Sequence, residues 1–369
     1  MTVFTPHQDQ ALKAVAAWLK SKPGRKQAPQ VFRLFGYAGT GKTMLARHVA
    51  EGVDGTVLFA AFTGKAALVM RAKGCVRAST IHSLIYRPRD SGEAVPSFEL
   101  WHEAPVSNAA LIVIDECSMV DTELGRDLLS FGVPVLVLGD PAQLPPIQGG
   151  GFFTDAEPDA MLTEVHRQAQ DNPIVHLSMQ VRQGQPLPIG RYDETAIISR
   201  ADCDPERVIA ADQVLVGRNA TRRAYNARIR QRRGLAGEYP VAGDKLVGLR
   251  NNKHKGLYNG ALWAVKERPS MRRGIMRMRL LPDDGFGSQS VHVAARAECF
   301  TGGIEALDWS QRKRYDEFDY GYVLTVHKAQ GSQWDDVVLF DESAAFGDAR
   351  ARWLYTGITR AAKRLTLVV

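Results

Sequence analysis

Cysteine is scarce in this sequence, which contains only Cys75, Cys117, Cys203 and Cys299, far apart and never as a C-x-x-C pair. That spacing argues against a zinc cluster and against a disulfide framework. Long apolar runs are also missing, since none approaches the ~20 residues that a membrane span needs. The first seven residues lack the charged and apolar blocks of a secretory signal. We therefore expect a cytoplasmic protein that does not contact a membrane.

The remaining composition is balanced, with a modest excess of positive charge. Of the 369 residues, 45% are hydrophobic and 24% are charged, which suits a globular protein with room for two or three domains. The formal net charge of +7 is compatible with a polyanionic partner but does not prove one. Arginines gather in two short segments, and each segment fits either a solvated face or a contact with phosphate. The two sets are Arg222, Arg223, Arg228, Arg230, Arg232 and Arg233, and Arg272, Arg273, Arg277 and Arg279.

The strongest motif lies at residues 36–43, which fit G-x-x-x-x-G-K-[ST] directly after the apolar run at 31–35. Such a loop joins a buried strand to a helix, and its glycines let the backbone approach a ligand closely. Backbone N–H groups at the start of the helix then form an anion site, while the lysine and hydroxyl serve phosphate and Mg²⁺. Glycine-rich turns without a nucleotide also exist, but the Lys-Thr pair disfavours that alternative. The candidate ligands are ATP and Mg²⁺, and the candidate residues are Gly36, Gly39, Thr40, Gly41, Lys42 and Thr43.

Two further apolar runs end in polar residues that suit the same site. The run at 111–114 leads into the carboxylates Asp115 and Glu116. In nucleotide sites of this kind the Asp holds Mg²⁺, and the Glu orients and deprotonates the attacking water. The run at 133–138 leads into a proline-rich exit, which we expect to point Gln143 toward the γ-phosphate.

Two polar residues allow more than one interpretation. Gln8 follows Thr5 by three residues and closes a capping box at the start of a helix predicted over residues 6–20. Its amide could equally read the edge of adenine, and the local sequence does not separate the two roles. His82, taken alone, is more often a structural histidine than a ligand contact.

The order of elements predicts an α/β protein with inserted segments. Strands and helices alternate up to residue 146, which predicts a parallel sheet with helices on both faces. Residues 85–107 break this alternation and are predicted to form a small hairpin. Residues 222–233 have helical spacing that places most of their arginines outward. From 241 to 318, short strands with glycine-rich turns predict a small β-barrel, after which the α/β pattern returns.

Taken in order, nine segments resemble those of superfamily 1 DNA helicases of the RecD-like and Dda-like branch, and they cover nearly the whole chain. One such motif alone is weak, whereas nine in the family's order and with plausible spacing form a strong signal. The segments are Gln8 and residues 36–43, 63–67, 79–84, 114–116, 139–144, 166–167, 325–331 and 355–360.

The resemblance implies two RecA-like P-loop NTPase domains with parallel sheets, which bind ATP in the cleft between them. A small hairpin insertion would belong to the first domain and a small SH3-like β-barrel insertion to the second. The expected bounds are 1–84 and 108–160 for the first domain, 85–107 for its insertion, 161–240 and 319–369 for the second domain, and 241–318 for the barrel.

The resemblance also assigns roles around the triphosphate. Two arginines reach across from the second domain, and an arginine at the transferring phosphoryl group is worth about 10³ to 10⁵ in rate. Hydrolysis would therefore depend on closure of the cleft. The assigned residues are Gln8 for adenine, Asp115 for Mg²⁺, Glu116 as catalytic base, Gln143 as γ-phosphate sensor, Lys42, Arg167 and Arg360 as catalytic cations, and Gln330 and Gly331 as the link to the DNA channel.

On the nucleic-acid side, the family pattern places several side chains near the backbone of single-stranded DNA. Hydroxyls and N–H groups at helix N-termini suit phosphate binding. Stacking of bases on aromatic rings adds about 1–3 kcal/mol per base without reading sequence. The hairpin is short for a strand-separating wedge, for which Phe98 and Trp101 are the candidates. The DNA-binding candidates are Thr63, Lys65, Thr80, His82, Thr325 and His327.

These observations lead to the hypothesis of a monomeric ATP-dependent DNA helicase that moves along single-stranded DNA, 5′ to 3′ as its relatives do. Its expected partners are single-stranded DNA, junctions of single and double strands, and a single-strand-binding protein or a repair or replication complex. One alternative is a translocase that does not unwind, which the short hairpin motivates. Another is a nucleotide-switched loader or regulatory subunit of a repair or recombination complex. RNA as a track is also compatible, because backbone contacts and stacking tolerate it.

Overall fold

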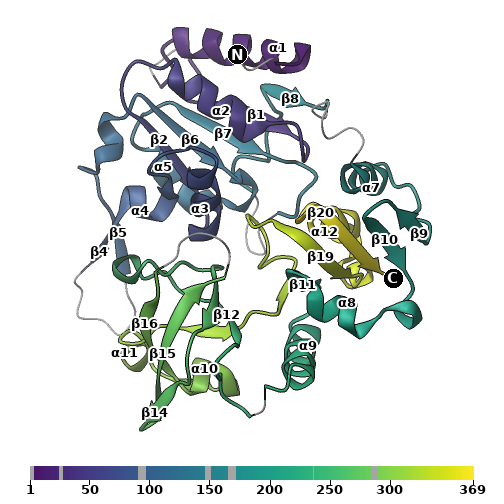
Figure 1. Cartoon of the computed structure of the whole chain (residues 1–369). Helices are drawn as coiled ribbons and strands as arrows, with labels where there is room; N and C mark the ends of the chain where they lie inside the picture. The colour runs from purple at the N-terminus through teal and green to yellow at the C-terminus, as the bar shows by residue number, and fades with distance from the viewer. Residues whose placement is uncertain are drawn as a thin grey trace.

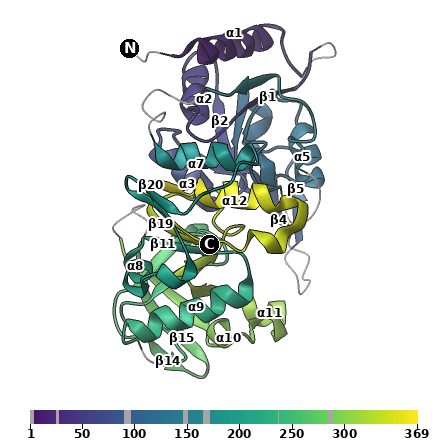
Figure 2. The ribbon, with the colours of Figure 1, turned by 90° about the vertical axis from the view of Figure 1, so that its right-hand side faces the viewer.

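Two lobes, each built on a mainly parallel β-sheet, make up most of the molecule in the computed structural model (Figure 1). The structure describes residues 4–24, 28–89, 97–145, 151–164, 172–235, 237–283 and 289–369. An antiparallel insertion lies below the lobes, at the end of the molecule opposite the N-terminal helix (Figure 2). None of the helices in these described ranges has the length and apolarity that crossing a membrane requires.

The first lobe contains six parallel strands in the order β3-β2-β6-β7-β1-β8. Alternate residues of a strand face opposite sides of the sheet, so these apolar runs bury both faces under helices. The strands are β1 (Val31–Gly36), β2 (Val57–Ala61), β3 (Ser79–Thr80), β6 (Leu111–Asp115), β7 (Val135–Gly139) and β8 (Ala160–Leu162). Helices α1 (Pro6–Lys20), α2 (Lys42–Glu51) and α3 (Gly64–Ala72) cover one face, while α4 (Ile81–Ile85) and α5 (Thr122–Leu129) cover the other. The predicted parallel sheet with helices on both faces is confirmed.

A short hairpin occupies the described part of segment 85–107. Strand β4 (Tyr86–Arg89) pairs antiparallel with β5 (Ser97–Leu100). Phe98 is 61% exposed on β5, whereas Trp101 packs against the core of the first lobe. Of the two wedge candidates, Phe98 is therefore the one that projects into solvent.

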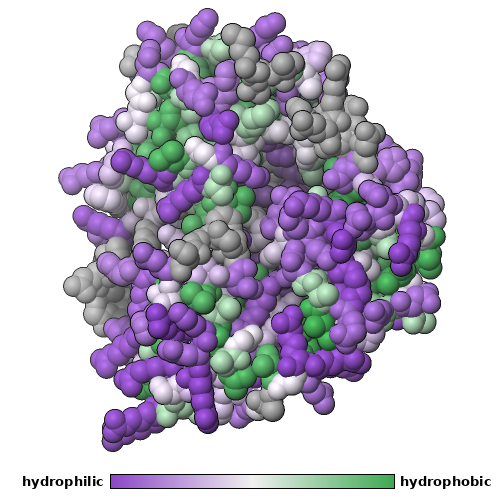
Figure 3. Space-filling model, viewed as in Figure 1, coloured by the Kyte–Doolittle hydropathy of each residue, from purple (hydrophilic) through white to green (hydrophobic). Residues whose placement is uncertain are grey.

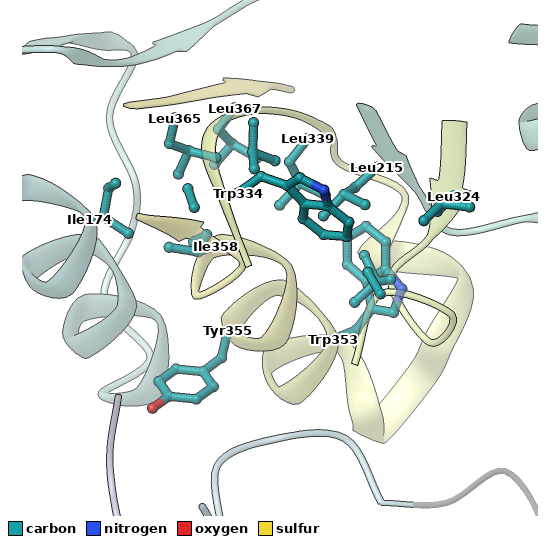
Figure 4. Close-up of a cluster of buried hydrophobic side chains, with 14 of the residues drawn as sticks. Ile174, Leu215, Leu324, Trp334, Leu339, Trp353, Tyr355, Ile358, Leu365 and Leu367 are labelled. Carbon is teal, nitrogen blue, oxygen red and sulfur yellow. The ribbon is translucent and has the colours of Figure 1, made fainter. Parts of the chain in front are cut away.

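The second lobe repeats the architecture with the strand order β18-β11-β19-β20-β10-β9, in which only β9 runs antiparallel to its neighbour. Figure 4 shows the apolar cluster that packs α7 and α12 against one face of this sheet. Helices α8 and α9 pack on the other face. The strands are β9 (Gly190–Tyr192), β10 (Thr195–Ile198), β11 (Gln213–Val216), β18 (Val323–Thr325), β19 (Trp334–Phe340) and β20 (Ala361–Val368). The helices are α7 (Pro173–Arg182), α8 (Pro205–Ala210), α9 (Asn219–Arg232) and α12 (Arg350–Ile358).

The insertion is antiparallel, with the order β14-β15-β13-β12-β17 and with β16 on the free side of β15. An isolated bridge between Ala295 and Asp316 joins β16 to the segment just before β17. This bridge connects the two ends of the strand order, β16 and β17, as closure into a barrel requires. Because β17 pairs with β12, this sheet continues through Tyr320, two residues beyond the expected end at 318. Its elements are β12 (Lys245–Gly248), β13 (Leu262–Val265), β14 (Ser270–Arg272), β15 (Ile275–Pro282), β16 (Val291–Arg296), β17 (Phe318–Tyr320), α10 (Glu298–Thr301) and α11 (Trp309–Arg312). The SH3-like character of this unit stays a prediction.

One arginine of α9, a helix predicted to carry most of its arginines outward, is buried. Arg230 is only 6% exposed, and its Nε and NH2 donate to the two carboxylate oxygens of Asp244 at 2.8 and 3.0 Å. Leaving one partner of such a buried pair alone costs about 3–5 kcal/mol. The pair ties α9 to the base of the insertion, which is a contact that helical spacing alone does not reveal.

Candidate active site

The phosphate loop follows β1 and leads directly into α2. Gly39 and Gly41 have φ values of 77° and 84°, in the left-handed region that glycine adopts without a steric penalty. A Cβ on Gly36 would lie 2.7 Å from Oγ1 of Thr40 and 2.8 Å from Cβ of Leu162, so only glycine fits there. The loop is therefore a tight cradle of backbone at a helix N-terminus, which is the geometry that binds phosphate.

Lysine and threonine side chains at the start of α2 contact the phosphate loop and the end of β6. The Lys42 ammonium donates to the carbonyl oxygens of Gly36 and Tyr37 at 2.6 and 2.9 Å, so it lies over the loop. The Thr43 hydroxyl donates to Oδ2 of Asp115 at 2.9 Å. Asp115 ends β6 beside the loop, as its sequence position predicts. A hydroxyl and a carboxylate oxygen at this distance form a pair that suits a hard cation such as Mg²⁺.

Glu116 lies at a strained turn immediately after β6. Its φ of 54° places a non-glycine residue in the left-handed region, which costs roughly 1–3 kcal/mol and is common at functional sites. Burial raises the pKa of the Glu116 carboxyl, and the Arg360 guanidinium opposes this shift. A carboxylate with a raised pKa is a better proton acceptor than an ordinary one.

Arg360 comes from the second lobe and faces this carboxylate. Its NH1 lies 3.9 Å from Oε1 of Glu116, and the residue is 5% exposed. The guanidinium is held by the carbonyl oxygens of Thr356 and Ser332, at 3.1 and 3.0 Å. These bonds fix the orientation of the guanidinium, which lines the cavity between the lobes.

A cavity of 420 Å³ lies between the loop and the second lobe. Gln143 lines it and is 7% exposed, and its Oε1 is a buried acceptor without a hydrogen-bond partner in the described residues. Such an atom fits a polar ligand or a water inside the cavity. The predicted residues that line the cavity are Gly39, Thr40, Gly41, Lys42, Thr43, Asp115, Glu116, Gln143, Gly331 and Arg360.

Several hydrogen bonds join the lobes along one rim of this cavity. The Tyr355 hydroxyl donates to Oδ2 of Asp140 at 2.7 Å and accepts from the N–H of Ala38, in the phosphate loop, at 3.0 Å. Figure 4 shows this hydroxyl directed away from the apolar cluster. Thr356 Oγ1 accepts from the N–H of Leu144 at 2.9 Å, and Gln330 Nε2 donates to the Leu144 carbonyl at 2.9 Å.

Tyr355 and Asp140 were not assigned roles from the sequence. Both lie inside segments that the family resemblance singled out, at 355–360 and 139–144, so the signal was present. The sequence does not indicate that the two residues form a hydrogen bond, because they lie 215 positions apart and meet only when the lobes pack. A cation–π contact adds to this rim, since the guanidinium carbon of Arg182 lies 3.4 Å from the ring centroid of Tyr37.

Gln8 has the predicted capping role and a second contact with the loop. Its Oε1 accepts from the N–H of Thr5, and its Nε2 donates to the Thr40 carbonyl, both at 3.0 Å. The predicted capping box is confirmed. In this conformation both ends of the amide hold backbone, so contact with adenine stays a prediction. Arg167, the other predicted arginine, lies outside the described residues.

The DNA-binding candidates occupy three helix or strand ends. Thr63 and Thr80 cap α3 and α4, accepting from Ala66 N and Ser83 N. Lys65, Thr80 and Thr325 are 3%, 8% and 9% exposed, so most of each side chain is covered in this conformation. A Cβ on Gly331 would lie 2.9 Å from Cβ of Ala66, which places the predicted linking segment against α3.

The two histidine candidates lie beside aromatic rings. His82 lies 6.0 Å from Phe62 and 5.7 Å from Tyr86, ring centroid to centroid, and His327 lies 5.5 Å from Phe346. Desolvation lowers the pKa of both histidines, so both are neutral at pH 7. Neutral rings beside aromatic rings suit stacking or hydrogen bonding better than charge pairing with phosphate.

Comparison with known proteins agrees with this geometry. Residues 7–202 match a family model described as an AAA domain, and residues 320–368 match one described as a UvrD-like helicase C-terminal domain. The ATP-dependent RecD2 DNA helicase of Deinococcus radiodurans is 27% identical over 363 residues, which cover 90% of this chain and 46% of that protein. The ATP-dependent DNA helicase dda of Enterobacteria phage T4 is 31% identical over 165 residues, 41% of this chain and 37% of that protein. The chain thus spans less than half the length of these relatives.

Solved structures of Pif1 helicases share the fold. One such structure describes DNA unwinding at forked duplex DNA by two coordinating Pif1 helicases. Its TM-score is 0.63 at 17% identity, and the match covers 100% of this chain and 92% of the Pif1 chain. Bacteroides Pif1 bound to single-stranded DNA has a TM-score of 0.60 at the same identity and coverage. The AAA-domain match covers more than half of the chain. The chain belongs to that family and is a member of the superfamily 1 helicases of the RecD-like and Dda-like branch.

Proposed function

We propose that the chain is an ATP-dependent DNA helicase, which hydrolyses ATP to move 5′ to 3′ along single-stranded DNA and to separate duplex. The observation that carries this proposal is the position of Arg360. It is buried, belongs to the second lobe, and points its NH1 to within 3.9 Å of Glu116 in the first lobe. A site that needs both lobes makes hydrolysis depend on their relative position, which is the requirement for a motor.

The residues that are present fit a nucleoside triphosphate with Mg²⁺. Glycine N–H groups of the loop and the Lys42 ammonium would hold the phosphates, while Thr43 and Asp115 would hold the ion. Mg²⁺, when bound, neutralises charge that develops on the phosphate oxygens. The unpartnered Oε1 of Gln143 supports the assignment, because a buried acceptor in this cavity can accept a hydrogen bond from the attacking water.

Three side chains would then carry the chemistry. Glu116 would take the proton of the attacking water, and its raised pKa suits that role. Arg360 would stabilise negative charge on the transferring group and is already oriented by backbone carbonyls. Lys42 would hold the β- and γ-phosphates. Arg167 keeps its proposed place as a second arginine from the other lobe.

Coupling to the nucleic acid would run through the rim contacts and the Gly331 segment. The hydroxyl of Tyr355 contacts the phosphate loop itself, through the N–H of Ala38. Gly331 lies in van der Waals contact with α3, whose N-terminal residues Thr63 and Lys65 are DNA-binding candidates. Hydrolysis of the triphosphate would therefore alter the contacts at both ends of the cleft. Alternating closure and release of the cleft would then move the two lobes along the strand in turn.

Strand displacement on tailed duplexes tests the proposal. We expect ATP-dependent separation of a duplex with a 5′ single-stranded tail and little separation with a 3′ tail. DNA-stimulated hydrolysis without any displacement would select the translocase alternative, for which the short β4–β5 hairpin is the structural motivation. Equal displacement of blunt, 5′-tailed and 3′-tailed duplexes would contradict movement in one direction. The absence of any displacement, together with ATP hydrolysis that does not respond to DNA, would contradict a motor altogether.

A further inference from the structure

Positive charge is concentrated in the insertion rather than spread over the molecule. Residues 241–318 contain fourteen lysines and arginines against nine acidic residues, and so carry +5 of the chain's formal +7. Figure 3 shows hydrophilic side chains gathered at the lower left, where β14, β15 and β16 lie in Figure 1. The excess charge therefore belongs to a unit that contributes no residue to the nucleotide cavity.

The strand register brings the basic side chains onto one face. Arg277 and Arg279 alternate on β15 with the buried Met276, Met278 and Leu280, so both arginines project from the outer side of the sheet. Arg279 lies opposite His292 of β16, and Arg277 lies opposite Ser270 of β14 and Ala294 of β16. Together with Arg268 and Lys255, these residues line a groove of 350 Å³, which we call the outer basic face.

Protein carboxylates leave this charge largely uncompensated. Lys255 pairs with Asp316 at 2.6 Å, and Arg279 donates only to the neutral Ser290 hydroxyl at 2.8 Å. Within the described residues, no ion pair joins Arg268, Arg277 or His292 to a carboxylate, and Glu267 is the acidic residue in the groove lining. Like charges held this close repel one another. An anionic ligand would relieve that repulsion.

We propose that the outer basic face binds the phosphate backbone of duplex DNA, as a contact separate from the single-strand path. Arginine forks suit phosphate oxygens. A single strand exposes its bases and is usually held by aromatic stacking platforms, whereas a duplex presents only its backbone and grooves. Among the described lining residues, no Phe, Tyr or Trp is present. The face therefore fits double-stranded rather than single-stranded DNA. This inference rests on the proposed function, since it extends the DNA track to the duplex ahead of it.

Binding of a blunt duplex and of an unstructured single strand, measured by fluorescence anisotropy across a salt series, tests the assignment. The test variant is Arg277→Gln with Arg279→Gln. Its matched control is Lys13→Gln with Arg191→Gln, which removes the same charge from exposed positions on α1 and β9. We expect the test variant to bind duplex several-fold more weakly. The slope of log K against log salt should fall by about 1.8, which corresponds to two lost phosphate contacts at about 0.9 each.

The single-strand measurements keep this inference separable from the proposed function. Single-strand affinity and DNA-stimulated ATPase of the test variant should match the wild type, which also shows that the variant folds. Unchanged duplex affinity and slope would overturn the inference, as would a wild-type protein that does not bind blunt duplex. An equal loss of single-strand affinity would also overturn it, by assigning the face to the single-strand path. Failure of the proposed function would appear instead as wild-type hydrolysis that ignores DNA.

Discussion

The two lobes share a sheet architecture but contribute different chemistry to the cavity between them. The first lobe supplies the phosphate loop and both carboxylates, Asp115 and Glu116, at the ends of parallel strands. The second supplies Arg360 and the rim contact at Tyr355, both from α12 or directly after it. In the proposed mechanism, the first lobe alone holds the triphosphate, whereas hydrolysis requires both lobes. Under the proposed function, that division of residues would make hydrolysis depend on the relative position of the lobes.

The most direct test of this division of roles is to remove the positive charge that the second lobe contributes to the cavity. We expect Arg360→Ala to lower kcat for ATP by about 10³ to 10⁵, because in the proposed mechanism the arginine stabilises charge on the transferring phosphoryl group. Nucleotide binding by the first lobe should persist in an equilibrium assay. The control is Arg364→Ala, which removes an exposed arginine paired with Glu194 at 2.6 Å. A kcat within tenfold of wild type would contradict the shared site.

Removing the carboxylate of Glu116, the proposed proton acceptor, should have the next largest effect. Glu116→Gln keeps the shape of the side chain, so we expect kcat to fall by about 10² to 10⁴ while the affinity for ATP is retained. Steady-state turnover and nucleotide binding, measured on the same preparation, check this. Turnover close to wild type would exclude Glu116 as the base.

The pH profile sharpens the same comparison. Because burial raises the pKa of Glu116 above its ordinary value, the carboxylate becomes protonated, and kcat falls, at a higher pH than for a solvated glutamate. Arg360 lowers that pKa, so Arg360→Ala should move the acidic limb of the residual activity to higher pH. An acidic limb that does not move in this variant would show that the two residues are not coupled.

A smaller effect is expected from the rim contact. Tyr355→Phe keeps the buried ring but removes the hydroxyl that joins Ala38 N to Asp140. Loss of this hydrogen-bonded hydroxyl should lower DNA-stimulated kcat/KM about tenfold, or about 1.4 kcal/mol. DNA-independent hydrolysis should change less. Equal losses with and without DNA would indicate that the hydroxyl supports only the nucleotide site.

The smallest effect concerns strand separation alone. Phe98→Ala removes an exposed ring from the β4–β5 hairpin, and loss of one stacking contact of about 1 kcal/mol should slow unwinding about fivefold. Hydrolysis stimulated by single-stranded DNA should be unchanged. The control is Ile189→Ala, which removes an exposed apolar side chain from the second lobe, away from the hairpin. Equal unwinding by the variant and wild type would remove Phe98 as the wedge.

Most local features of the chain can be predicted from the sequence. The phosphate loop, the carboxylates after β6 and the capping box at Gln8 each depend on residues close together in the chain, so spacing and residue type specify them. The alternation of strands and helices likewise predicted the covered parallel sheet. Apolar runs are sufficient for that prediction, because a sheet buried on both faces requires them.

Contacts between distant segments were not readable in the same way. Tyr355 with Asp140 depends on how the lobes pack, and Arg230 with Asp244 depends on how the insertion meets α9. The continuation of the antiparallel sheet through Tyr320 also reflects pairing with β12 rather than a local turn signal. These features arise from tertiary packing, which overrides helical spacing and turn chemistry at single positions.

Steady-state ATP hydrolysis by the wild-type chain, with and without an unstructured single-stranded oligonucleotide, tests the shared-site account most directly. If both lobes must close around one triphosphate and a threaded strand favours that closure, kcat should rise many-fold in the presence of DNA. The Arg360→Ala variant should show no such rise. Identical wild-type rates with and without DNA, over a saturating range of oligonucleotide, would contradict the account.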